Sequence, residues 1–118
     1  MKIFVNAHEE SLNSLIDKSF GRCNYFLIYE TENDSFQFVK NPHQDSQESV
    51  GAAVAKSAIE SGAKAVLAVN PGPRAFNLLQ NENIDIYRVN EDSTLKDAIN
   101  AFTKNELIKS DNFTPYQI

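Results

Sequence analysis

Only three side chains in this sequence could supply a thiolate or imidazole ligand to a metal. Cys23 is the only cysteine, and His8 and His43 are the only histidines. A thiolate is a ligand for iron, copper and sulfide clusters, and an imidazole binds many transition metals. The alternatives are a cysteine buried in the core, as free cysteines commonly are, and a histidine exposed in the turn after Asn41-Pro42. Cys23 and His43 are therefore the candidate metal ligands.

Two further positions could bind an anion. The planar guanidinium of Arg22 can clamp an anion, or it can brace its loop against Asp17 or Glu30. The Gly72-Pro73 pair indicates a helix start, where free N–H groups and the positive end of the helix dipole attract negative charge. Pro73 removes one of these donors. Arg22 and Gly72 are therefore the candidate anion-binding residues.

The charge balance argues against two large classes of partner. The chain has 118 residues, with 11 lysines and arginines against 16 acidic residues, and a formal net charge of -5. No basic cluster is present that could bind nucleic acid or an anionic membrane surface. No apolar stretch approaches the roughly 20 residues that span a bilayer, and a single cysteine fits a reducing compartment. We therefore expect a cytoplasmic protein that binds neither nucleic acid nor membrane.

The sequence contains none of the common catalytic motifs. There is no Gly-x-x-x-x-Gly-Lys phosphate loop, no Gly-x-Ser-x-Gly elbow and no His-Glu-x-x-His pair. The first predicted strand ends at Asn6 and carries none of the carboxylates that two-metal nuclease chemistry would require. We therefore expect a binding protein and no enzyme.

Hydrophobic patterning predicts five strands and three helices in one α/β domain. Apolar runs and alternation indicate strands over residues 2–6, 25–29, 35–40, 64–69 and 84–89. Helical periodicity indicates helices over residues 49–61, from Pro73, and from Leu95, the last opened by Thr94 and Asp97 as a capping box. We expect a single domain over residues 1–108 and a loosely ordered tail over residues 109–118.

The order of these elements predicts a mixed sheet with strand order 3-2-1-4-5, in which the second strand runs antiparallel to its neighbours. The segments after the other four strands then leave from one edge, and ligands of open α/β sheets bind outside the carboxyl ends of parallel strands. These segments are residues 7–24, 41–48, 70–73 and 90–93. The first is long, which is typical of a functional connection, and we expect Leu12, Leu15 and Ile16 to form a helical turn that packs it down.

The sequence resembles a known family from Phe20-Gly21-Arg22 onwards. That segment, followed by Tyr25-Phe26-Leu27-Ile28, is similar to the dinitrogenase iron–molybdenum cofactor biosynthesis family, which comprises small domains related to nitrogenase accessory proteins. The resemblance covers almost the whole chain. It continues through Asn41-Pro42, Gly51-Ala52-Ala53-Val54-Ala55, Gly62-Ala63-Lys64-Ala65-Val66-Leu67, Gly72-Pro73, Ile84 to Tyr87 and Glu106-Leu107.

The resemblance implies a ribonuclease-H-like fold and the binding or carrying of metal–sulfur clusters, such as iron–sulfur species, the iron–molybdenum cofactor or its precursors. It implies that the ligand chemistry lies around Phe20-Gly21-Arg22, so we expect a ligand edge of Ser19, Phe20, Gly21, Arg22 and Gly72. Cys23 and His43 stay the candidate metal ligands on their own chemistry, and we expect a protein partner in cluster assembly. Two departures are evident. Ser19 stands where cofactor-binding members tend to carry a histidine, and Val69-Asn70-Pro71-Gly72 keeps only the last glycine of a glycine-rich stretch.

These departures indicate a member that acts outside nitrogenase itself. Two classes of function stay open at this point. The first is a non-catalytic carrier for a metal–sulfur cluster or a related anionic metal species. The second is a protein-interaction or regulatory domain that binds no metal.

Overall fold

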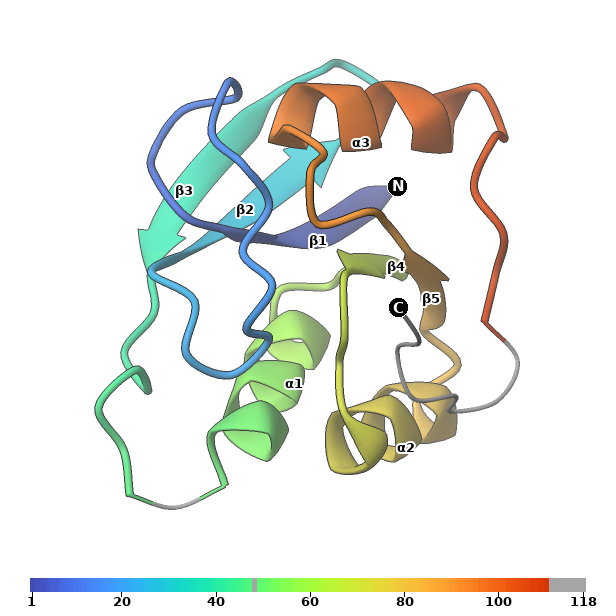
Figure 1. Cartoon of the computed structure of the whole chain (residues 1–118). Coiled ribbons are helices and arrows are strands. Elements are labelled where there is room, and N and C mark those ends of the chain that lie inside the picture. The colour runs from blue at the N-terminus through green and yellow to red at the C-terminus, as the bar shows by residue number, and fades with distance from the viewer. Residues whose placement is uncertain (48, 111–118) are drawn as a thin grey trace.

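In the part of the chain that the structure describes, five strands form one mixed β-sheet in the order β3-β2-β1-β4-β5, and three helices connect and cover them (Figure 1). The computed structural model describes residues 1–47 and 49–110. The strands are β1 (Lys2–Ala7), β2 (Tyr25–Glu30), β3 (Phe36–Lys40), β4 (Ala65–Ala68) and β5 (Asp85–Arg88). The helices are α1 (Val50–Glu60), α2 (Pro73–Asn81) and α3 (Leu95–Thr103). The predicted strand order and the number of helices are confirmed.

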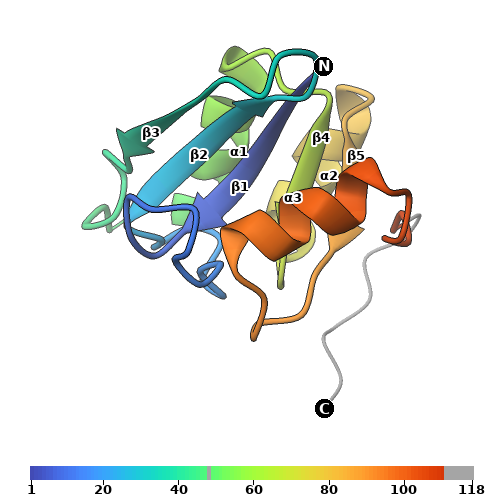
Figure 2. The ribbon, with the colours of Figure 1, turned by 90° about the horizontal axis from the view of Figure 1, so that it is seen from above.

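Strand directions agree with the prediction as well. β2 pairs antiparallel with β1 on one side and with β3 on the other, whereas β4 pairs parallel with both β1 and β5. In Figure 2 the arrowheads of β1 and β3 accordingly point to one edge of the sheet and that of β2 to the opposite edge. The connections after β1, β3, β4 and β5 therefore leave from the same edge, which is the predicted ligand edge.

The helices form two unequal layers on the sheet. α1 and α2 cover one face and α3 covers the other (Figure 2). Alternation along β1 supplies both cores, because Phe4 packs toward α1 and α2 while Ile3 and Val5 pack toward α3. Thr94 is the N-cap of α3, as predicted, since its hydroxyl accepts a hydrogen bond of 3.1 Å from the Asp97 N–H, which is one half of the predicted capping box.

The predicted helical turn in the long first connection is wrong. Ile16 instead forms an isolated antiparallel bridge with Ala7, and Leu15 forms one with Thr94. The physical reason is that serine side chains here bind the local backbone, since the Ser14 hydroxyl accepts from the Glu9 N–H at 2.9 Å. Such bonds compete with helical ones. Ile16 is buried as expected, but 52% of Leu15 is exposed.

Residues 109 and 110, which begin the predicted tail, pair with β5. Lys109 forms an antiparallel bridge with Tyr87, and the Ser110 N–H donates to the Ile86 carbonyl at 2.8 Å. The rest of that tail, residues 111–118, lies outside the described residues. Among the helices of the described chain, none is long and apolar enough to cross a membrane.

Candidate functional site

Asn41 holds the ligand edge together from the end of β3. Its side chain is buried, with 3% exposed, and its amide nitrogen donates to the carbonyls of Gly21 at 3.0 Å and Cys23 at 2.8 Å. Its Oδ1 accepts a hydrogen bond of 2.9 Å from the His43 N–H. One side chain therefore fixes the end of the first connection against the loop that follows β3.

Asn6, near the end of β1, also fixes the end of the first connection. It is fully buried, and its amide nitrogen donates to the Phe20 carbonyl at 3.0 Å and to the Cys23 Sγ at 3.4 Å. Its Oδ1 has no hydrogen-bond partner among the described residues. Sequence reasoning gave neither asparagine a role at the site. The available signal was an asparagine near the end of β1 and another directly after β3.

Cys23 lies between the side-chain amides of Asn6 and Asn41 and has no exposed surface. Its burial raises the pKa of the thiol from an ordinary value of 9.0 to about 11, and the charge of Asp17 raises it further, against the lowering effect of the amides of Asn6 and Asn41. At neutral pH Cys23 is therefore a protonated thiol, whereas metal ligation and nucleophilic attack both need a thiolate.

We expect Cys23 to be inert toward a disulfide reagent at pH 7 and to react only after unfolding in guanidinium, because the thiol is both enclosed and protonated. A raised folded-state pKa contributes stability that is fully present below about pH 9 and is lost as the pH rises toward 11. The free energy of unfolding should thus fall between pH 9 and 11 in the wild type and fall less in Cys23→Ser. Rapid labelling of the native protein at pH 7 would contradict this placement.

Arg22 braces the loop after β3. The side chain is exposed, yet its Nη1 donates to the Gln44 carbonyl at 2.7 Å and its Nη2 to the Ser46 carbonyl at 3.2 Å. Arg22 therefore braces its loop, which is one of the two roles considered from the sequence, but its partners are backbone carbonyls and not Asp17 or Glu30. The Arg22 N–H donates to the Ser19 hydroxyl at 3.1 Å, which fixes the turn that precedes it.

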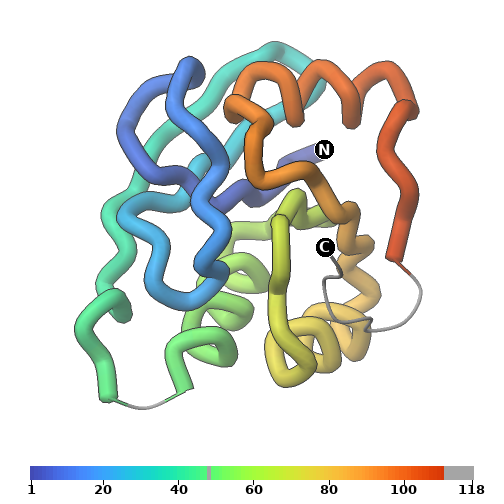
Figure 3. The backbone as a smooth tube through the Cα atoms, in the orientation of Figure 1, coloured from blue at the N-terminus to red at the C-terminus, as the bar shows by residue number. Residues whose placement is uncertain are grey.

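Phe20 and Gly21 set how closely this turn approaches α1. Phe20 is a core residue with 4% of its surface exposed. A Cβ on Gly21 would stand 2.5 Å from the Val50 Cγ2 and 2.8 Å from the Gly51 backbone nitrogen. Only a glycine permits this approach, so Gly21 brings the first connection against the first turn of α1. Figure 3 traces that connection from the start of α3 to the start of α1.

The first turns of α1 and α2 also lie side by side. A Cβ on Gly51, in the first turn of α1, would stand 4.0 Å from the Ala75 Cβ, in the first turn of α2. Neither N-cap residue, Ser49 or Gly72, makes a side-chain capping hydrogen bond. Gly72 has a φ of 81°, and no atom lies within 4 Å of the place where its Cβ would be. The start of α2 is therefore open beside Gly72, whereas the start of α1 is covered by Gly21 on the side of the first connection.

The start of α3 is different, because the protein itself satisfies its N–H groups. Leu95 and Lys96 donate to the carbonyls of Ser14 and Leu12, each at 2.9 Å, and the third donor is capped by Thr94. The first N–H groups of a helix have no partner within the helix. Within residues 1–47 and 49–110, the first N–H groups of α1 and α2 have no such partner, so they are the candidate contacts for an external anion, and Pro73 supplies no donor.

The two histidines do not join Cys23. The His43 Nε2 lies 3.3 Å from the Ser57 hydroxyl, and the His8 Nδ1 lies 3.6 Å from the Asp17 Oδ2. Across residues 1–47 and 49–110, no three side chains of His, Cys, Asp or Glu are close enough together to hold a metal ion. The donors at this edge suit an anion bound by N–H groups better than a metal ion bound by side chains.

Comparison with known proteins gives a consistent family. The family profile described as "Dinitrogenase iron-molybdenum cofactor" matches residues 1–105. The uncharacterized protein MJ0580 of Methanocaldococcus jannaschii is 29% identical over 100 residues, which are 82% of this chain and 84% of that protein.

Two solved structures share the fold. The apo form of the orange protein from Desulfovibrio gigas superimposes with a TM-score of 0.90 at 26% identity, covering 98% of this chain and 96% of that one. The NifB-like protein TM1290 from Thermotoga superimposes with a TM-score of 0.82 at 28% identity, covering 98% of each chain.

Proposed function

Because this chain belongs to the dinitrogenase iron–molybdenum cofactor family, we propose that it is a non-catalytic carrier that binds an anionic metal–sulfur species as its cargo, outside nitrogenase itself. The proposed contact is the surface formed by the first turns of α1 and α2 and the open side of Gly72, which we call the paired helix start. The observation that carries the proposal is that these two helix starts lie side by side without a side-chain cap.

Electrostatics supports the paired helix start as the place where an anion binds. The whole chain carries a formal charge of -5 and would repel an anion over most of its surface. Each helix start contributes about half a positive charge, and the exposed Arg74 adds a full one in the first turn of α2. Arg22 lies on the loop that Gly21 presses against α1, although two of its donors already serve carbonyls.

The cargo would keep its own sulfide ligands. The buried Cys23 is protonated, and His43 is paired with Ser57, so neither is ready to replace a sulfide on the metal. Backbone N–H groups and a guanidinium can instead hydrogen-bond to the sulfides of an intact anion. This mode of binding needs no bond to the metal and allows the cargo to be released unchanged.

The test is an anaerobic titration with tetrathiomolybdate, a coloured dianion of molybdenum and sulfide, followed by absorption spectroscopy and equilibrium dialysis. We expect stoichiometric binding, and we expect Arg74→Glu to weaken it about tenfold, or about 1.4 kcal/mol. Lys64→Glu makes the same charge change at the opposite edge and should have little effect, because salt screens charges beyond about 10 Å.

Cys23→Ser separates the proposed mode from direct ligation. Unchanged stoichiometry and affinity in this variant fit binding through N–H groups, whereas loss of binding would make Cys23 a metal ligand. If tetrathiomolybdate and reconstituted iron–sulfide both leave the protein colourless, the carrier proposal fails. A protein-interaction domain that binds no metal would then be the better account.

A further inference from the structure

The two edges of the sheet are protected differently. The outer side of β5 is paired with the chain itself, through the bridge of Lys109 to Tyr87 and the hydrogen bond of Ser110 to Ile86. Within the described residues, no strand or bridge pairs with the outer side of β3. An open edge strand is a template for pairing with another chain, and proteins usually blunt it with charges, proline or a cover.

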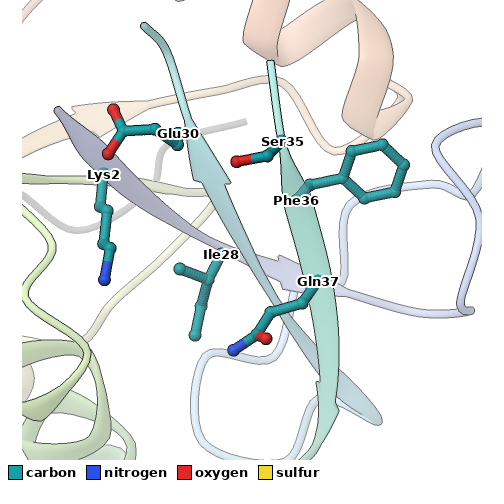
Figure 4. Close-up of a pocket in the computed structure, with 6 residues that line it drawn as sticks. All are labelled: Lys2, Ile28, Glu30, Ser35, Phe36 and Gln37. Carbon is teal, nitrogen blue, oxygen red and sulfur yellow. The ribbon is translucent and has the colours of Figure 1, made fainter. Parts of the chain in front are cut away.

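β3 is rich in large apolar residues although it lies at the edge. Its sequence, Phe-Gln-Phe-Val-Lys, contains three large apolar residues in five positions. Phe36 is 48% exposed on one face and Val39 is 37% exposed on the other. Figure 4 shows Phe36 leaving the strand on the opposite side from Gln37 and Ile28. Apolar side chains on both faces of an open edge indicate that something covers β3.

The hydrogen-bond pattern fixes which residues face outward. In an antiparallel pair, every second residue exchanges both backbone hydrogen bonds with the residue opposite it. The residues in between direct their N–H and C=O groups to the other side of the strand. The Glu30 N–H donates to the Ser35 carbonyl, and the Asn41 N–H donates to the Asn24 carbonyl, so residues 35, 37, 39 and 41 face β2. The N–H and C=O groups of Phe36, Phe38 and Lys40 therefore point to the free edge.

That set of residues is self-complementary. If a second β3 approaches antiparallel with Phe38 opposite its own copy, Phe36 lies opposite Lys40 of the other chain and Lys40 opposite Phe36. Each of these three pairs then exchanges both of its hydrogen bonds. Phe36, Phe38 and Lys40 also lie on one face, so the Lys40 stem covers the exposed ring of Phe36 and its ammonium adds a cation–π contact.

Charge along the strand fits the same register. The turn before β3 carries Glu32 and Asp34, and the far end of β3 carries Lys40. Antiparallel pairing of two copies brings each Lys40 near the acidic turn of the other chain, whereas parallel pairing would align like charges. We propose that this chain forms a two-fold homodimer through β3, which joins two five-stranded sheets into one continuous sheet.

The experiment is sedimentation and light scattering of the full chain over a concentration series, with two opposite substitutions at one exposed position. Phe36→Lys places two ammonium groups opposite each other and should shift dissociation to at least about tenfold higher concentration. Phe36→Glu places a carboxylate opposite Lys40 and should retain the dimer. If net charge alone controlled dimerisation, Phe36→Lys would dimerise more strongly than Phe36→Glu, because Phe36→Lys makes the chain less negative.

The double variant Phe36→Lys with Lys40→Glu restores an opposite-charge pair and should dimerise again. Amide exchange gives an independent readout, since the amides of Phe36, Phe38 and Lys40 should become protected as concentration rises while those of residues 37 and 39 are protected throughout. A wild-type chain that stays monomeric at millimolar concentration would overturn the proposal. The proposal would also be overturned if Phe36→Lys and Phe36→Glu both dimerised as strongly as each other. Tetrathiomolybdate binding should be unaffected by either substitution, so this proposal and the carrier proposal can fail separately.

Discussion

Replacing Asn41 by alanine is expected to lower the free energy of unfolding by about 3 kcal/mol. The substitution leaves the buried carbonyls of Gly21 and Cys23 without a donor and the His43 N–H without an acceptor. Each buried polar group that loses its partner costs about 1–3 kcal/mol, and partial relaxation reduces the sum. Urea or guanidinium denaturation measures the difference.

Two companion variants sharpen this result. Asn41→Asp should cost at least as much, because a carboxylate oxygen cannot donate to either carbonyl. Asn70→Ala removes an exposed asparagine at the same edge and should change the stability by less than about 0.5 kcal/mol. If Asn41→Ala were as mild as Asn70→Ala, Asn41 would not be the side chain that holds the two loops together.

Replacing Gly21 by alanine should cost about 1–3 kcal/mol, because the new methyl group would meet backbone atoms of α1 at 2.8 and 2.9 Å. A flexible side chain could move aside, but the first turn of a helix has to shift as a unit. Since that turn is half of the paired helix start, we also expect weaker tetrathiomolybdate binding. Denaturation and dialysis measure the two effects separately.

Gly51→Ala is the matched control, because it adds the same methyl group to a neighbouring glycine in the first turn of α1. Its methyl group would meet only the Ala75 Cβ, at the ordinary contact distance of 4.0 Å, and alanine is a better helix former than glycine by about 1 kcal/mol. Gly51→Ala should therefore leave the stability unchanged or raise it. Equal destabilisation by both variants would show that the approach at Gly21 is not specifically tight.

The fold could be predicted from the sequence because its signals are local. The apolar run Tyr25–Tyr29 and the pair Thr94 and Asp97 each indicate an element within a few residues, and the order of the elements then limits the sheet topology. The first connection could not be predicted in this way. Its conformation depends on bridges to Ala7 and Thr94, and a local apolar pattern carries no information about such distant pairing.

The candidate site was predictable in position but not in its contacts. Strand direction places Arg22 and Gly72 at one edge, as the structure has them. The partners of Arg22 are carbonyls, which every residue possesses, so no sequence pattern marks Gln44 and Ser46 as the ones it binds. The burial of Cys23 likewise depends on Asn6 and Asn41, which reach it from two different strands.

The central claim is that the paired helix start holds an anionic metal–sulfur cargo, and a nuclear magnetic resonance titration with tetrathiomolybdate tests it most directly. We predict that the largest amide shifts occur at Ala52 in α1 and at Arg74 and Ala75 in α2, while the capped donors Leu95 and Lys96 of α3 stay unchanged. Shifts concentrated at Cys23 and His43, or no saturable shifts at all, would contradict it.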